Sequence, residues 1–414
     1  MEKRRVYLDN AATTPVLDEV VQEMLPYMNS RYGNPSSLHA LGREARAAVD
    51  RARERIERAV GMMDGGYSSG SSGSSRALVV FTSGATEANN LALKGFAYAM
   101  LRDGKSRDDV MVIASSVEHE SVLEPCRALE RDGFDVRYLP VDSYGMVRPE
   151  SLEGELRSAE GKSMLVSVML ANNEVGTIQR LREIAVIAHD HGALVHSDAA
   201  QAFGKVPIDA RALQVDMLTI SAHKVYGPKG IGALCISSSS SRDVRLEPVM
   251  HGGGHEYGLR SGTQNVPAIV GFGKVAELVP MLISMYGSKV KRLRDRLMAG
   301  ILEIPYTRLN GHAEMRLPNN VHVSFLGVNG EDLIMKLDEY GVEASTGSAC
   351  STLKQRESHV LRAMGLKREE INGSLRLTLG IQNDEQDIEY ALDVMRRVVR
   401  ELRRISPYSR YRST

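Results

Sequence analysis

Short apolar runs alternate with longer helical patterns between about residues 77 and 236. These runs are ALVVF, VMVIAS, MLVSVML, ALVHSD, DMLTIS and GALCIS. Helical patterns that begin near Thr86, His119 and Leu181 follow the first three of them. Parallel neighbouring strands need a crossover, usually a helix, so this alternation indicates a mostly parallel sheet with both faces covered. The predicted fold class is therefore α/β, with a large domain built on that sheet.

A polar segment directly follows most of the predicted strands. These segments are SGATEANN, SSVEHES, LANNEVG, SDAAQ and SAHK. Ligands of open parallel sheets bind in the crevice beyond the carboxyl ends of the strands. We therefore expect these segments, which are far apart in the sequence, to meet at one site.

The pattern changes near Pro267 to long helices, two alternating strands (NNVHVSF and SLRLTL) and a charged final helix near residues 384–403. We predict a large domain over residues 16–262 and a smaller α/β domain over residues 1–15 and 263–414. The glycine- and serine-rich segment 65–76 is expected to be a flexible insertion in the large domain.

Charge and cysteine usage limit the classes of partner. Lysine plus arginine and aspartate plus glutamate both number 52, so there is no broad positive field for binding nucleic acid. No apolar run approaches the roughly 20 residues of a membrane span, and the amino terminus lacks an apolar signal segment, so we expect a cytoplasmic protein without a membrane partner. Cys126, Cys235 and Cys350 are too scattered for a disulfide framework or a metal site.

Lys224, Asp198 and Gln201 suggest pyridoxal-phosphate chemistry. Lys224 follows a predicted strand, where a lysine can form a Schiff base with an aldehyde cofactor. Asp198 ends the strand ALVHSD and can pair with a protonated pyridine nitrogen, while Gln201 can hydrogen-bond the phenolic oxygen. Taken singly, Lys224 could be a surface lysine and Asp198 a helix cap.

A phosphate site is predicted where TSGATEANN opens a helix. The free backbone N–H groups of Ala85 and Thr86, together with the helix dipole, favour an anion, and the Thr86 hydroxyl adds a donor. His119 lies at the same sheet edge and could stack on a pyridine ring or carry a proton. A helix start or a histidine of this kind is common without a ligand, so only the combination is informative.

Taken together, these segments resemble the cysteine desulfurases of the class V aminotransferase group, of the type that serves iron–sulfur assembly. The matching segments run in family order from Leu8 to about Gly380 and include LDNAATTP, GNPSSLH, SGATEANN, EHES, NNEVG, SDAAQ, SAHKVYGPKG, GGGHEYGLRSGT and TGSAC. The resemblance implies an aspartate-aminotransferase-like fold, pyridoxal 5'-phosphate as cofactor, L-cysteine as substrate and a homodimer. It also implies a sulfur acceptor, either an iron–sulfur scaffold protein or a protein of tRNA thiolation.

The resemblance also implies individual roles for site residues. Lys224 would hold the cofactor, Asp198 would face the ring nitrogen and His119 would stack on the ring. The remaining cofactor contacts would come from Gln201 and Asn173 at the phenolic oxygen, from Ala85, Thr86, Ser221 and His223 at the phosphate, and from Thr263 at the phosphate of the other subunit. Arg376 would bind the substrate carboxylate with its planar fork, helped by Asn34 or Asn173.

Cys350 lies among small and flexible residues, whereas Cys235 lies in an apolar run and Cys126 in a helical pattern. This context favours a mobile loop that carries a nucleophile, and the resemblance identifies Cys350 as the sulfur acceptor. The expected reaction converts L-cysteine to L-alanine and leaves a persulfide on Cys350, with Lys224 moving the α-proton and His119 as a proton carrier.

Other functions share part of this pattern. Another class V aminotransferase or lyase would use Lys224 and Asp198 but would not need Cys350. A selenocysteine lyase would use the same chemistry, and a non-catalytic binding protein would keep only the fold. The intact set of lysine, aspartate, phosphate turn and cysteine favours the desulfurase.

Overall fold

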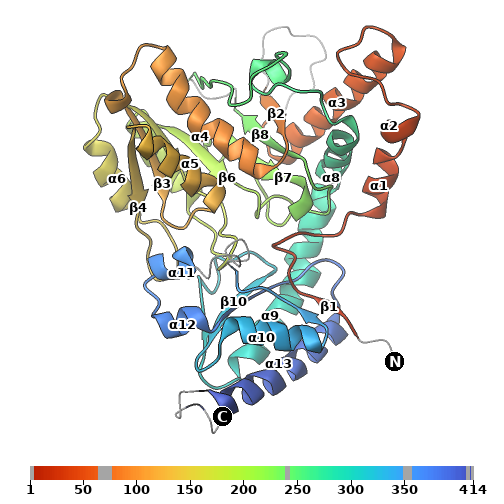
Figure 1. Ribbon diagram of the computed structural model, residues 1–414, viewed down its shortest axis with the longest axis vertical. Helices are drawn as coiled ribbons and strands as arrows, with labels where there is room; N and C mark the ends of the chain where they lie inside the picture. Colours follow the sequence, from red (N-terminus) through yellow and green to blue (C-terminus); the bar gives the residue numbers. More distant parts are fainter. Residues whose placement is uncertain (1–3, 64–76, 238–242, 348–356, 407–410, 412–414) are drawn as a thin grey trace.

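The computed structural model describes residues 4–63, 77–237, 243–347, 357–406 and 411 (Figure 1). Cys350 and the predicted insertion 65–76 lie outside the described residues, so their behaviour stays a prediction. The predicted domain boundaries also stay a prediction.

A seven-stranded sheet forms the upper part of the molecule (Figure 1). Its order is β2 (Leu78–Thr82), β8 (Gly232–Ile236), β7 (Met217–Ser221), β6 (Leu194–Asp198), β5 (Ser163–Ser167), β3 (Val110–Ser115) and β4 (Asp135–Leu139). All neighbouring pairs from β4 to β7 are parallel, and only β8 runs antiparallel to its neighbours β7 and β2. The prediction of an α/β fold on a mostly parallel sheet is confirmed.

Helices cover both faces of this sheet. Helices α4 (Ala85–Arg102) and α5 (Glu120–Arg131) pack on one face, in a core that contains Val112 and Leu165. The other face packs against α3 (Ala40–Ala59), α6 (Pro149–Arg157), α7 (Leu181–Asp190) and α8 (Val266–Met285). Strand residues alternate between the two cores, since Val112 contributes to the first and Ile113 to the second.

The lower part of the molecule holds a second, antiparallel sheet (Figure 1). Its order is β12 (Ser374–Thr378), β10 (Asn320–Phe325) and β9 (Thr307–Leu309). The neighbouring helices are α9 (Lys291–Leu302), α10 (Gly330–Glu339), α11 (His359–Ala363), α12 (Arg368–Asn372) and α13 (Glu385–Ile405). Strand β1 (Val6–Tyr7) pairs in parallel with β11 (Val342–Glu343), so the start of the described chain lies against this part. The short helices α1 (Asp18–Met24) and α2 (Pro26–Asn29) follow.

The helical segment from Val266 to Leu302 is long and apolar enough to cross a membrane by length and composition alone. In the folded chain, 61% of its apolar window is buried inside the protein. Its first part, α8, packs against α3 and α1. Burial in the protein core therefore explains the composition of this helix.

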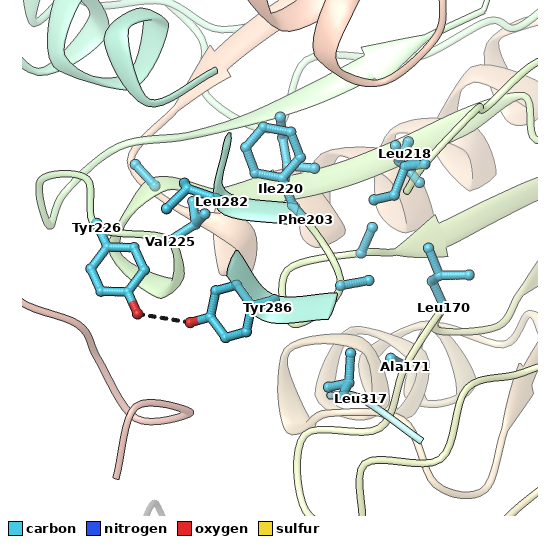
Figure 2. Packing of buried hydrophobic residues seen from close by; sticks show 14 of the residues in the cluster. Leu170, Ala171, Phe203, Leu218, Ile220, Val225, Tyr226, Leu282, Tyr286 and Leu317 are labelled. Atoms are coloured by element: carbon cyan, nitrogen blue, oxygen red, sulfur yellow. Dashed lines mark hydrogen bonds between the residues drawn. The ribbon is translucent and has the colours of Figure 1, made fainter. Parts of the chain in front are cut away.

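The turn after β6 is packed tightly between β7 and α8 (Figure 2). Gly204 in this turn has a φ of 71°, and a side chain there would overlap Val225. Nearby, the hydroxyl groups of Tyr226 and Tyr286 form a buried hydrogen bond of 2.9 Å. This packing fixes the course of the chain just beyond the carboxyl end of β6.

Candidate active site

The carboxyl ends of the parallel strands open into a cavity of about 1310 Å³. It brings together ten of the predicted site residues, namely Ala85, Thr86, His119, Asn173, Asp198, Gln201, Ser221, His223, Lys224 and Arg376. Most of them follow strands of the large sheet, whereas Arg376 lies on β12 of the second sheet. The cavity is therefore bounded by both sheets.

Two predicted residues that the structure describes, Asn34 and Thr263, are not among those that line the cavity. Asn34 is exposed, and its side-chain oxygen accepts a hydrogen bond from the backbone N–H of Ser36 at 2.9 Å. Thr263 is also exposed, as a residue aimed at a second subunit would be in a single chain. Cys350 lies outside the described residues.

Lys224 ends a short 3-10 turn that follows β7. Its ammonium group donates hydrogen bonds to the backbone carbonyls of Ala11 (2.7 Å) and Ala12 (2.8 Å). The Ala11 carbonyl also accepts a hydrogen bond from Gln201 Nε2 at 2.9 Å. The N-terminal segment thus holds the lysine in place at the cavity wall.

Asp198 is 6% exposed and is held on both oxygens. Oδ1 accepts from the backbone N–H of Ala200 (2.9 Å), and Oδ2 accepts from Asn89 Nδ2 (2.7 Å). Asn89 Nδ2 also donates to the Ser121 hydroxyl, which lies 2.8 Å from His119 Nδ1. Asn89, which sequence reasoning did not assign although it lies in SGATEANN, therefore connects the carboxylate to the histidine.

Two of the histidines that line the cavity, His119 and His223, have lowered pKa values, which favour the neutral imidazole. Burial lowers the pKa of His119, and nearby Lys224 lowers it further while Asp198 opposes the shift. Burial followed by the charge of Lys224 lowers the pKa of His223 to about 4. A neutral imidazole can stack on a ring or exchange a proton without bringing a fixed positive charge into the cavity.

The start of α4 offers backbone donors to an anion. The first backbone hydrogen bond of this helix is donated by the Ala88 N–H to the Gly84 carbonyl. The N–H groups of Ala85 and Thr86 therefore precede the intrahelical hydrogen bonds. A Cβ on Gly84 would meet nothing within 4 Å, which leaves the turn open. The partial positive charge of the helix N-terminus favours a phosphate at this wall of the cavity.

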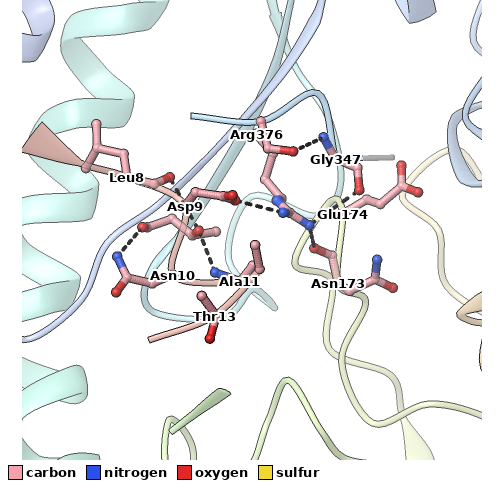
Figure 3. Close-up of polar contacts among 12 residues, drawn as sticks. Leu8, Asp9, Asn10, Ala11, Thr13, Asn173, Glu174, Gly347 and Arg376 are labelled. Atoms are coloured by element: carbon pink, nitrogen blue, oxygen red, sulfur yellow. Dashed lines mark hydrogen bonds and ion pairs between the residues drawn. The ribbon is translucent and has the colours of Figure 1, made fainter. Parts of the chain in front are cut away.

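Arg376 is buried and held between two segments of the chain (Figure 3). Its Nη1 donates to the Asn173 carbonyl and its Nη2 to Asp9 Oδ1, both at 2.9 Å. Among the described residues, neither Arg376 Nε nor Asn173 Oδ1 has a hydrogen-bond partner, although both are buried. Buried polar atoms usually have a partner, so these two provide an acceptor and a donor that a polar ligand could use.

Sequence reasoning did not assign a role to Asp9 or Glu118, although both lie in segments that carry the resemblance. Asp9 holds the guanidinium of Arg376. Glu118 is fully buried, and its Oε1 accepts from the Ser115 hydroxyl (2.6 Å) and the Met169 N–H (2.8 Å), while Oε2 has no partner among the described residues. Burial raises the pKa of Glu118 to about 8, with the charge of Asp198 acting in the same direction.

This shift predicts that protonated Glu118 stabilises the fold. The stabilisation is fully present below the ordinary pKa of 4.5 and is lost as the pH rises through 8, because the folded chain binds the proton more tightly. As the pH rises from 5 to 8, the free energy of unfolding of Glu118→Gln should therefore increase by about 3 kcal/mol relative to that of the parent. Urea unfolding at both pH values measures this, with exposed Glu150→Gln as the control. If the difference in unfolding free energy between Glu118→Gln and the parent were the same at pH 5 and pH 8, the prediction would be wrong.

The cavity residues fit pyridoxal phosphate. A fixed lysine, a buried carboxylate, the N-terminus of a helix and the ring of His119 all line this cavity. The unpartnered atoms of Asn173 and Arg376 remain for a substrate.

Comparison with known proteins identifies the family. The chain matches the aminotransferase class-V family over residues 6–391. It is 45% identical to cysteine desulfurase IscS of Methanosarcina thermophila, over 98% of this chain and 95% of the relative. It is 46% identical to cysteine desulfurase IscS 1 of Archaeoglobus fulgidus, over 98% and 99%.

Solved structures agree. A NifS-like protein superposes with a TM-score of 0.84 at 37% identity, covering 96% of this chain and 99% of that one. SspA, solved in complex with cysteine, superposes with a TM-score of 0.75 at 35% identity, covering 90% and 98%. Matches of this length in sequence and in structure show that the chain belongs to the aminotransferase class-V family and, within it, to the cysteine desulfurases.

Proposed function

We propose that this chain converts L-cysteine to L-alanine and transfers the sulfur to Cys350 as a persulfide. The observation that carries the proposal is a single cavity that joins a fixed lysine, a buried carboxylate and an arginine whose Nε has no hydrogen-bond partner among the described residues. The first two suit a pyridoxal-phosphate enzyme, and the third suits an amino-acid carboxylate.

Pyridoxal phosphate, when bound, supplies an aldehyde and an electron sink for the carbon chemistry. Lys224 is the residue proposed to hold it and to move the substrate α-proton. Asp198 would keep the ring nitrogen protonated, because its carboxylate is fixed by Asn89 and Ala200. Phosphate binding is assigned to Ala85, Thr86, Ser221 and His223, and contacts with the phenolic oxygen to Gln201 and Asn173.

Sulfur transfer needs no external oxidant. The Cβ–S bond of the substrate breaks while Cys350 Sγ bonds to the departing sulfur, and a proton takes the place of sulfur on the carbon. The carbon is reduced and the two sulfur atoms end as a persulfide, so the electrons balance. His119, whose lowered pKa favours the neutral imidazole, is the proposed proton carrier.

The substrate carboxylate is assigned to Arg376. Its Nε is buried without a partner among the described residues, and Asp9 and the Asn173 carbonyl fix the plane of the guanidinium. A homologous structure, SspA, was solved with cysteine, which agrees with an amino-acid substrate of this size.

Arg376→Lys should raise KM for L-cysteine by about 10- to 100-fold with a smaller change in kcat, because lysine keeps the charge and loses the planar fork. Steady-state kinetics of alanine formation measure both constants. Arg308→Lys, at an exposed arginine on β9, is the control. A KM equal to that of the parent would contradict the assignment.

We also propose a homodimer in which Thr263 reaches the phosphate of the partner subunit. Large apolar side chains are exposed along α1, α2 and the segment that follows, at Val21, Leu25, Met28, Tyr32 and Leu38. These residues are close together in the sequence, and exposed apolar side chains that gather on one face of a protein mark an interface. The exposed Asn34 lies in the same stretch and remains a candidate substrate contact in the dimer.

Light scattering of the holoenzyme should give twice the mass of the chain. Thr263→Ala should weaken cofactor binding by about tenfold, since it removes one hydrogen bond to a charged group, while the dimer persists. Titration of the apoenzyme with pyridoxal phosphate measures the affinity. A monomer with full cofactor occupancy would contradict the proposed dimer site.

The acceptor of the sulfur is proposed to be an iron–sulfur scaffold protein or a protein of tRNA thiolation, in the cytoplasm. Selenocysteine lyase activity would use the same residues and is the second candidate. Purified protein mixed with L-cysteine and a thiol should release sulfide and alanine in equal amounts. Pyruvate and ammonia in place of alanine would indicate a lyase instead.

A further inference from the structure

Lys205 is a buried amine directly behind the candidate active site. Its side chain is 1% exposed, and its ammonium group donates to the Gln201 carbonyl (3.0 Å) and to Gln201 Oε1 (3.1 Å). Among the described residues, no carboxylate forms an ion pair with it. Burial, together with the charges of Lys224 and Arg376, lowers the pKa of Lys205 to about 7.

Packing alone does not explain this amine. A methionine would fill a similar volume without the cost of burying an ammonium group. The turn that carries Lys205 is fixed by Gly204, where any side chain would overlap Val225, so the lysine stem has a defined course to Gln201. The hydrogen bonds of this amine both go to Gln201.

The contacts of Gln201 determine which way its amide faces. Oε1 accepts from Lys205, and Nε2 donates to the Ala11 carbonyl, which also holds Lys224. In the reversed amide, Nε2 would face the ammonium donor and Oε1 would face the carbonyl acceptor, so both hydrogen bonds would be lost. In the observed orientation, the second N–H of Nε2 is left for a ligand in the cavity that Gln201 lines.

We propose that Lys205 is a positioning residue that fixes the side-chain amide of Gln201, so that its N–H group is presented to the phenolic oxygen of the cofactor. The proposal rests on the proposed function, which assigns this oxygen to Gln201. It adds Lys205 to the residues that tune the cofactor although Lys205 itself does not line the cavity.

The pH titration of the visible absorbance of the bound cofactor should report this role. A well-placed N–H donor draws charge from the phenolic oxygen, which then holds the neighbouring proton less tightly. Lys205→Met releases the amide and, at pH values where Lys205 is protonated, also removes a nearby positive charge. Both changes raise the pH of the absorbance midpoint. We expect a rise of about half a pH unit or more, which is about threefold in the ratio of the two forms.

Gln201→Leu and the double variant show whether Lys205 acts through Gln201. Gln201→Leu should also raise the midpoint, and Lys205→Met should add clearly less in that background than in the parent. Lys205→Leu provides a second apolar variant, with the same expected shift, if Lys205→Met does not fold. Urea unfolding of each apoenzyme measures any purely structural effect separately.

Two results would overturn the proposal: a Lys205→Met protein with lower stability but an unchanged absorbance midpoint, or full additivity with Gln201→Leu. Alanine formation by the parent tests the proposed function independently. A parent that forms alanine while Lys205→Met leaves the midpoint unchanged would contradict the role of Lys205 alone.

Discussion

Lys224→Ala is expected to abolish the covalent attachment of the cofactor and to lower the rate of alanine formation by at least about a thousandfold. The side chain of the substituted alanine has no amine to bond to the aldehyde or to move the α-proton, and the cavity walls otherwise stay intact. The carbonyls of Ala11 and Ala12, which hold the lysine in the parent, are backbone groups and remain in place. Borohydride reduction followed by peptide mapping measures the attachment.

In the parent, the reduced cofactor should map to Lys224 and to no other lysine. The informative competitors are Lys229, which also lines the cavity, and the buried Lys205. The control is Lys105→Ala, which removes an exposed lysine outside the cavity and should keep parental activity. Recovery of the cofactor on Lys229 or Lys205 would show that the central assignment is wrong.

Cys350→Ser should lower the rate of alanine formation by about a thousandfold or more, while cofactor binding stays normal. A serine hydroxyl stays protonated near pH 7 and attacks sulfur poorly, whereas the thiolate is the nucleophilic form of cysteine. Rapid mixing with L-cysteine should still change the visible absorbance, because cofactor and substrate binding do not need Cys350. Mass spectrometry after a single turnover should find no persulfide.

The other two cysteines provide matched controls. Both are fully buried, and burial raises the pKa of the Cys126 thiol to about 12 and that of Cys235 even further. Neither thiol is a nucleophile near pH 7, so Cys126→Ala and Cys235→Ala should keep parental activity per folded molecule. Alanine release by Cys350→Ser at the parental rate would mean that sulfur transfer does not pass through Cys350.

Strand periodicity was sufficient to predict the large sheet, because its central strands are buried on both faces and appear as continuous apolar runs. The rule that parallel strands present their carboxyl ends at one edge then predicted a common site. The cavity does contain Asp198 from the end of β6 and Lys224 just after β7. Strand β4 was missed because it is an edge strand whose residues Arg137 and Tyr138 are exposed, so its sequence lacks an apolar run.

Residues that act through other residues could not be predicted from the sequence. Asn89 and Asp198 are 109 positions apart, and Asp9 and Arg376 are 367 apart, so only the folded chain shows that they are paired. Lys205 lies four residues after Gln201, a spacing that in a helix would place them on one face, yet this segment is a turn. Burial of Glu118 likewise depends on strands β3 and β5, which supply its two hydrogen-bond donors at or just beyond their ends.

Following the sulfur of the substrate is the most direct test of sulfur transfer to Cys350. The parent holoenzyme is mixed with L-cysteine labelled at sulfur, without any added thiol, and stopped after one turnover. We expect labelled persulfide on the peptide that contains Cys350, with one alanine formed for each persulfide. Labelled sulfide in solution with pyruvate and an unmodified Cys350 would contradict it.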